Sequence, residues 1–179
     1  MRQVVPGSER PFQKTLTKMT QSFLATILSS VFGLIGMAGI SLAGPIGGYD
    51  CAIVATARYA VGDRNEHDVV SFQYTCNGVD GVFKNAVVTA ISVVELDNEE
   101  GAFLASFSLH RSPDGFAAEQ LLEGIGDIVV EGDNAVGIEA YGKTLFKFAS
   151  GTLECLTDKT VKFTAKPTGF GKFKLEFTD

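Results

Sequence analysis

The chain of 179 residues has no tryptophan and only two histidines, and each scarcity narrows the range of functions. Two histidines exclude a histidine-rich metal site within one chain. Tryptophan is the best platform for stacking on a sugar, so a stacking glycan module is not favoured, although the four tyrosines leave glycan binding open. The sequence also lacks a Gly-x-Ser-x-Gly nucleophile elbow and a His-Glu-x-x-His zinc motif. We therefore expect no bound metal, no cofactor and no catalytic set of these kinds.

Cysteine is scarce too, with three residues at Cys51, Cys76 and Cys155. None of them forms a Cys-x-x-Cys pair, which excludes a zinc knuckle and a thiol-redox motif of that type. In an oxidising compartment three cysteines are expected to give one disulfide and one leftover thiol.

Charge is absent from residues 22–43, a run of 22 residues. Four basic residues and one acidic residue precede this run, and the small-x-small triplet Ser41-Leu42-Ala43 ends it. A basic start, an apolar middle and a small-residue exit predict a signal peptide over residues 1–43. We therefore expect an exported protein, periplasmic or extracellular. The run is also long enough to span a bilayer, so an uncleaved membrane anchor is the alternative.

The part after the leader is acidic and of single-domain size. The leader holds four of the 15 basic and one of the 21 acidic residues, which leaves 11 basic and 20 acidic residues, a net charge of −9. Such a domain repels phosphate backbones, so we expect no nucleic-acid binding. We expect membrane contact only if the leader stays attached. The remaining 136 residues, 44–179, predict a single β-domain.

Apolar and polar residues alternate with a period of two along most of this part, which predicts strands with one buried and one wet face. Turn signals rich in Gly, Asn and Asp separate these runs. We expect an all-β protein, an antiparallel β-sandwich or barrel of nine to ten strands. The exception is a short helix predicted from Asp114 to Glu123, which Asp114 caps and Gly124 ends.

The alternation also assigns the faces of individual strands. It predicts three buried sets of residues: Val70, Phe72, Tyr74 and Cys76; Val161, Phe163 and Ala165; and Phe173, Leu175 and Phe177. A fourth buried set should contain Phe103, Ala105, Phe107 and Leu109. His110 then lies on the opposite, polar face and should be exposed.

The first hairpin predicts the disulfide. If the strands pair symmetrically about Asp63-Arg64, Tyr59 faces Asp68, Ile53 faces Tyr74 and Cys51 faces Cys76. We therefore expect a disulfide between Cys51 and Cys76. A bridge from Cys155 to either of them is the alternative.

Two clusters combine a histidine with acidic and basic residues that could bind a ligand or move protons. They are Asp63, Arg64, Glu66, His67 and Asp68 at the tip of the first hairpin, and His110, Arg111 and Asp114 before the expected helix. Both are binding candidates, and a solvated polar loop explains the same residues.

Acidic turns raise the question of calcium, which prefers six to eight oxygen ligands. The weak candidates are Asp97, Glu99, Glu100, Asp127, Glu131 and Asp133. Neither stretch has the pattern of a helix-loop-helix calcium site, and solvated turns account for them equally well.

These observations favour an exported protein with a non-catalytic binding or structural role. One mechanism is a ligand module whose loops bind a small molecule or glycan. The other is self-assembly, or assembly with a protein partner, in which the strand from Lys172 to Thr178 adds to a neighbouring sheet. The alternatives are a small secreted enzyme that uses one of the histidine clusters, and a membrane-anchored accessory subunit that keeps its leader.

Overall fold

The computed structural model describes residues 45–97, 100–132 and 134–179. The predicted leader, residues 1–43, lies outside them. No helix in the described part of the chain has the length and apolar character needed to cross a membrane. The described elements are β1 (Pro45–Ala60), β2 (His67–Gly78), the 3-10 helix η1 (Gly81–Phe83), β3 (Val87–Asp97), β4 (Glu100–Ser112), β5 (Gly115–Glu131), β6 (Asn134–Ala149), the 3-10 helix η2 (Gly151–Leu156), β7 (Lys159–Gly169) and β8 (Lys172–Thr178).

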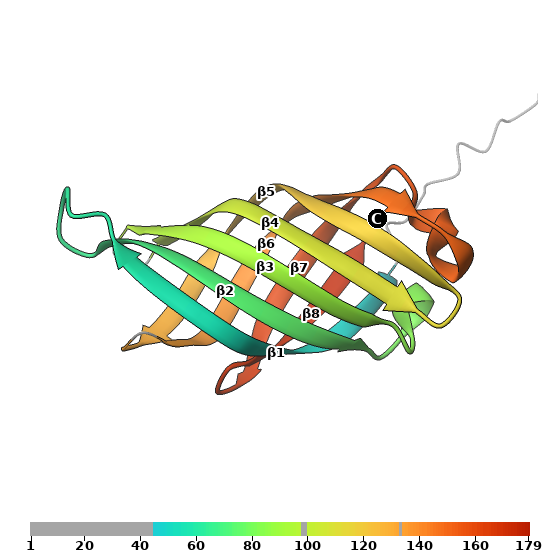
Figure 1. The fold of residues 1–179 in the computed structure, drawn as a ribbon, viewed down its shortest axis with the longest axis horizontal. Coiled ribbons are helices and arrows are strands. Elements are labelled where there is room, and N and C mark those ends of the chain that lie inside the picture. Colours follow the sequence, from blue (N-terminus) through green and yellow to red (C-terminus); the bar gives the residue numbers. More distant parts are fainter. Residues whose placement is uncertain (1–44, 98–99, 133) are drawn as a thin grey trace, which may run out of the picture. The chain divides into compact units, whose positions relative to one another are not determined.

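The strands form a closed antiparallel barrel in which each one pairs with its neighbours in sequence and β8 pairs back with β1 (Figure 1). The all-β prediction is confirmed, and of its two architectures the barrel is found. The described residues contain eight strands rather than nine or ten, because β5 and β6 run unbroken for 17 and 16 residues. Since β8 has partners on both sides, the predicted edge-strand assembly through Lys172–Thr178 is wrong.

The short helix predicted from Asp114 to Glu123 is also wrong. Asp114 lies in the turn between β4 and β5, and residues from Gly115 onward belong to β5. The local run Ala117-Ala118-Glu119-Gln120-Leu121-Leu122 has good helix formers, but pairing with β4 on one side and β6 on the other overrides this weak preference.

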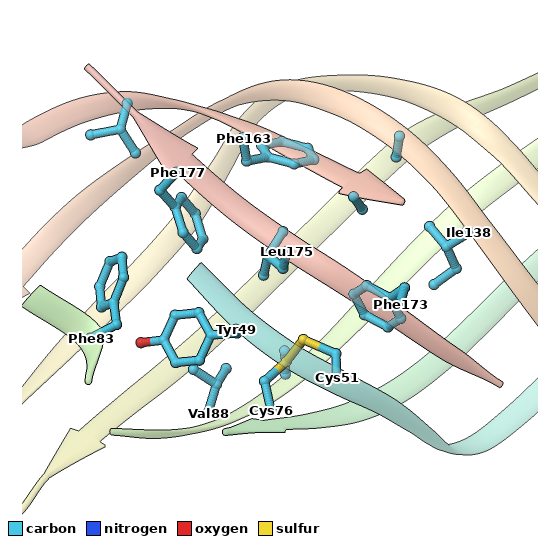
Figure 2. Close-up of a cluster of buried hydrophobic side chains, with 14 of the residues drawn as sticks. Tyr49, Cys51, Cys76, Phe83, Val88, Ile138, Phe163, Phe173, Leu175 and Phe177 are labelled. Carbon is cyan, nitrogen blue, oxygen red and sulfur yellow. A yellow bond between two sulfur atoms is a disulfide. The ribbon is translucent and has the colours of Figure 1, made fainter. Parts of the chain in front are cut away.

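The barrel interior confirms most of the predicted faces. Val70, Phe72 and Cys76 of β2 are buried, as are the predicted sets of β7 and β8. Figure 2 shows Phe163, Phe173, Leu175 and Phe177 gathered around Tyr49 and the disulfide. Burial of these rings supplies the main apolar contribution to folding.

The first hairpin contains the predicted disulfide, Cys51–Cys76, with the two Cα atoms 4.0 Å apart and the residues directly opposite in the register (Figure 2). The alternative bridge from Cys155 is excluded, since that cysteine is a free, exposed thiol in η2. Between Ala55 and the turn, the predicted register of the hairpin is wrong by one residue. Val54 is an extra residue in β1, so Tyr59 pairs with Val69 rather than with Asp68.

A similar irregularity reverses the predicted face of β4. Val94 pairs with Phe103 and Val93 with Ala105, so Leu104 is an extra residue in β4. One extra residue moves every later side chain to the opposite face. Phe107 is therefore 53% exposed on the outside of the barrel, and the prediction that it lies in the core is wrong. The interior receives Ser106, Ser108 and His110 instead.

One end of the barrel is plugged by the connections that carry η1 and η2, which contact each other (Figure 1). Phe83 of η1 and Leu153 of η2 are fully buried. Both short helices begin at a glycine with positive φ, and a Cβ there would lie 2.0 Å from the Ile46 carbonyl oxygen at Gly81 and 1.6 Å from the Asp114 carbonyl oxygen at Gly151. Only glycine fits such a conformation and approach.

Candidate functional site

His110 lies inside the barrel beneath this plug, with no exposed surface. The prediction that it is exposed is therefore wrong, and the extra residue at Leu104 is the reason. Its ring packs against Phe83 and Phe146, with centroid separations of 5.5 Å and 5.1 Å. An imidazole enclosed by aromatic rings has no access to bulk water, so the protein must supply its hydrogen-bond partners.

Those partners are Tyr49 on one side of the ring and Glu119 on the other. The Tyr49 hydroxyl lies 2.7 Å from Nδ1 of His110, and Nε2 of His110 lies 2.9 Å from Oε2 of Glu119. The Ser108 hydroxyl donates to the same carboxylate oxygen and lies 2.8 Å from Nε2. Because a carboxylate only accepts, Nε2–H donates to Glu119. The three strands β1, β4 and β5 thus each contribute one residue to a continuous hydrogen-bonded network, Tyr49–His110–Glu119.

Glu119 is the charged end of this hydrogen-bonded network. Burial alone raises the pKa of a carboxyl group, but hydrogen bonds from His110, Ser108 and Thr144 together with the charge of His110 outweigh it and hold the pKa of Glu119 below its ordinary value. The group is therefore ionised at neutral pH. Burial also raises the pKa of the Tyr49 phenol, and the nearby Glu119 charge adds to that rise, so the phenol keeps its proton.

A small cavity lies beside Glu119 within the barrel. Its volume is about 30 Å³, room for one or two water molecules. Its polar lining is Tyr74, Ser92, Ser106 and Glu119, and aromatic and aliphatic side chains form the rest. The Ser92 and Ser106 hydroxyls are 2.8 Å apart, and both hydrogen-bond to the Tyr74 phenol. Mostly apolar walls with a few convergent polar groups resemble the lining of small-molecule sites, but the volume is about a tenth of the smallest such pockets, about 300 Å³.

The wall next to this cavity is irregular. β4 and β5 pair at Ala102–Ile125 and again from Phe107–Gln120 onward, but in these fully described stretches no pairing joins residues 103–106 to 121–124. Phe103 and Leu121, from the two unpaired stretches, line the cavity and are only half-buried. Glu119 itself keeps 14% of its side chain exposed. The cavity is therefore bordered by a part of the barrel wall in which β4 and β5 are not paired with each other.

The other predicted cluster, at the tip of the first hairpin, does come together. His67 is buried at the loop end of the barrel wall, with Nδ1 2.5 Å from Asp63 and Nε2 2.7 Å from Glu95 of β3. Arg64 bridges Asp63 at 2.7 Å and Asp97 at 2.6 Å. Sequence spacing identified Asp63, Arg64 and His67 but missed Glu95, which the β2–β3 pairing brings beside them.

Hydrogen bonds to Asp63 and then to Glu95 raise the pKa of His67 above its ordinary value. The bond from His67 lowers the pKa of Asp63 in return. Of the two remaining candidates here, Asp68 is paired with Arg58 instead, and Glu66 is exposed in the loop with a positive φ. The cluster is thus a set of charge pairs that ties the loop to β3.

The residues predicted to accompany His110 do not converge with it. Arg111 and Asp114 are both exposed, on the outer side of β4 and in the following turn. The interior site instead uses residues that sequence reasoning missed, namely Tyr49, Tyr74, Ser92, Ser106, Ser108 and Glu119. The alternating run Ser106-x-Ser108-x-His110, together with Glu119 among alanines and leucines, was the available signal.

The calcium candidates are divided by the fold. Asp97 and Asp127 line one groove of about 810 Å³ on the outer surface, together with Glu95 and Glu139. Asp97 is already paired with Arg64. Glu131 is exposed near the β5–β6 turn, and Glu99, Asp133 and the side chain of Glu100 lie outside the described residues. In the described part of the chain, no three histidine, cysteine or acidic residues are arranged to hold a metal ion.

Comparisons with protein-family models, with curated proteins and with solved structures find no match for this chain. The functional conclusion therefore depends on the geometry of the interior site.

Proposed function

We propose that this is an exported, non-catalytic binding protein that holds a small ligand inside its barrel, with Glu119 as the principal acceptor. The observation that carries the proposal is a cavity in which an ionised carboxylate, a phenol and two serine hydroxyls converge within otherwise apolar walls. Replacing a buried ion pair by apolar residues often stabilises a protein, so stability alone does not account for such a cluster.

The lining defines the class of ligand. A carboxylate accepts hydrogen bonds and attracts positive charge, so it favours an amine or another strong donor. Phe72, Phe103 and Phe163 form the apolar side, with Phe103 in edge contact with both of the others. The ligand is therefore a small molecule with an apolar body and one donor group. Phe103 and Leu121, which border the unpaired stretch of β4 and β5, must move aside to admit it.

The test uses benzylamine as the probe and toluene and benzoate as its matched controls. In an NMR titration of the purified protein, benzylamine should shift resonances of residues around Glu119, and both controls should bind more weakly. E119Q should weaken benzylamine binding by about tenfold or more, the loss expected for a charge-assisted hydrogen bond. H67A, at the other cluster, should leave it unchanged. Equal binding to E119Q, or no binding at all, would contradict the proposal.

A second variant separates the effect of cavity size from recognition of the probe by Glu119. L121A enlarges the cavity on its apolar side and leaves all of its polar lining in place. It should therefore bind benzylamine more tightly than the wild type, with the same preference over benzoate. A loss of that preference would show that Glu119 does not orient the probe.

A small secreted enzyme remains the second candidate, because His110 and Glu119 form a proton-transfer pair next to the cavity. The NMR titration distinguishes the two functions when it is repeated with any molecule that copurifies. A binding protein releases that molecule unchanged, whereas an enzyme converts it.

Export is supported by the Cys51–Cys76 disulfide, which fits an oxidising compartment. The predicted signal peptide over residues 1–43 also favours export. N-terminal sequencing of the native protein should find Gly44 first. Finding Met1 instead would favour the membrane-anchored accessory subunit.

A further inference from the structure

The outside of the barrel carries an apolar surface over four neighbouring strands, interrupted by exposed Arg111, Gln120 and the Glu123–Lys143 ion pair. Its exposed members, here called the β3–β6 outer face, are Ile91, Leu104, Phe107, Phe116, Leu122 and Phe148. The strand registers place Ile91 beside Phe107 and connect Phe107 with Phe148 through the paired residues Leu109 and Ala118. On β5, Phe116 precedes Ala118 by two residues, and Leu122 follows Gln120, the partner of Phe107, by two. Side chains this close form one patch rather than scattered contacts.

The outer surface of β7 and β8 shows that closure of the barrel does not require an apolar outer face. The outward positions of β7 and β8 carry Lys162, Thr164, Lys166 and Lys172, and the barrel closes there equally well. The apolar side chains of the β3–β6 outer face make no contribution to the interior. An exposed patch of more than a few hundred Å² usually marks an interaction site.

We infer that the β3–β6 outer face packs against the same face of a second copy of this chain to form a two-fold dimer. The area fits. Half of each phenylalanine ring is exposed, so the three rings offer roughly 300 Å², and the aliphatic side chains bring the apolar surface to roughly 500 Å². This matches the apolar share of a standard interface, which buries about 800 Å² per partner, about 65% of it apolar in homodimers.

The charges disfavour a membrane as the occupant. The groove next to the face carries Glu95, Asp97, Asp127 and Glu139, and the chain has a net charge of −6. Anionic lipid would repel this edge. Gln120, beside Phe107, is exposed within the face. Its amide both donates and accepts hydrogen bonds, so it can pair with its own copy across a two-fold axis.

The experiment is sedimentation velocity of the purified protein over a range of concentrations around about 10 μM, which lies above the dissociation constants of most standard-size interfaces. The wild type should sediment as a dimer. F107K/L122K should raise the dissociation constant by about 100-fold or more, as expected for central interface residues. Circular dichroism checks that this variant is folded. The matched control is Y59K/F170K, which removes two rings that are even more exposed, 62% and 73%, but lie away from the face, and it should leave the dimer intact.

Three outcomes would overturn the inference. The wild type could remain monomeric at every concentration, or F107K/L122K could dimerise as the wild type does. In the third, the protein is a monomer that floats with phosphatidylcholine vesicles, which would assign the face to lipid. None of these results affects ligand binding at Glu119, so the dimer and the proposed function fail separately.

Discussion

The two histidines of this protein offer the same chemistry in opposite surroundings. His67 lies at the loop end of the wall and bonds to Asp63 and Glu95, whose side chains are 49% and 39% exposed. His110 bonds to Glu119 inside the barrel, among Phe83, Phe146 and Phe177. Water and salt can replace the exposed partners of His67, whereas His110 and its partners lie inside the barrel, where little water is available to replace them.

This difference explains why only one of the pairs is a candidate site. The surface pairs fasten a loop, and their carboxylates are shared with Arg64. The interior pair lies next to a cavity, and the described residues contain no buried side-chain nitrogen or oxygen without a partner. A complete buried network has a fixed geometry, which is what recognition of a small ligand requires.

The largest effect is expected from E119A, which breaks the interior pair. It removes the acceptor of Nε2–H of His110 and of the Ser108 hydroxyl inside the barrel, beside a cavity with room for only one or two water molecules. The loss of unfolding free energy should be about 3–5 kcal/mol. Urea denaturation followed by circular dichroism measures it. A loss below about 1 kcal/mol, the size of an exposed pair, would show that water reaches this pair freely.

A quadruple variant, Y49F/S108A/H110L/E119M, replaces all four members of the hydrogen-bonded network by apolar residues. Because no buried polar group is left alone, it should lose less stability than E119A does. The same variant should no longer bind benzylamine. If it is both stable and binding-competent, the interior network is unnecessary for recognition.

Acid should weaken the interior pair. The pKa of Glu119 is lower in the folded protein than its ordinary value of 4.5, so its contribution is complete above 4.5 and is lost as the pH falls through the folded-state pKa. The stability difference between the wild type and E119Q should therefore shrink on acidification. Denaturation curves of both proteins at several acidic pH values test this, and a constant difference would contradict it.

The smallest effect is expected from H67A. The pKa of His67 is raised in the folded protein, so its contribution is complete below 6.5 and is lost as the pH rises through the folded-state pKa. The melting temperature of H67A should differ from that of the wild type by a small amount that decreases at alkaline pH and in about 1 M salt, where the charge of His67 is lost or screened. A difference that stays the same in both conditions would show that the charge of His67 makes no contribution.

The strands with unbroken alternation were predictable from the sequence. β2, β7 and β8 bury the residues that a period of two assigns to the interior. Cys51 pairs with Cys76 as predicted, although the register next to the turn was wrong by one residue, because the extra residue Val54 cancels that error. Single extra residues at Val54 and Leu104 were not predictable, because a bulge has no fixed sequence pattern. The extra residue at Leu104 turned Phe107 outward and His110 inward, and it therefore decided which residues form the candidate site.

The sequence by itself therefore determined that the chain from Pro45 onward forms antiparallel strands with one buried and one exposed face and one disulfide, because alternation and turn residues act locally. Only the tertiary structure decided that the strands close into a barrel, that Glu119 meets His110, and that the outer side of β3–β6 is apolar. These features depend on registers between distant segments, in which a shift by one residue exchanges the inside and the outside.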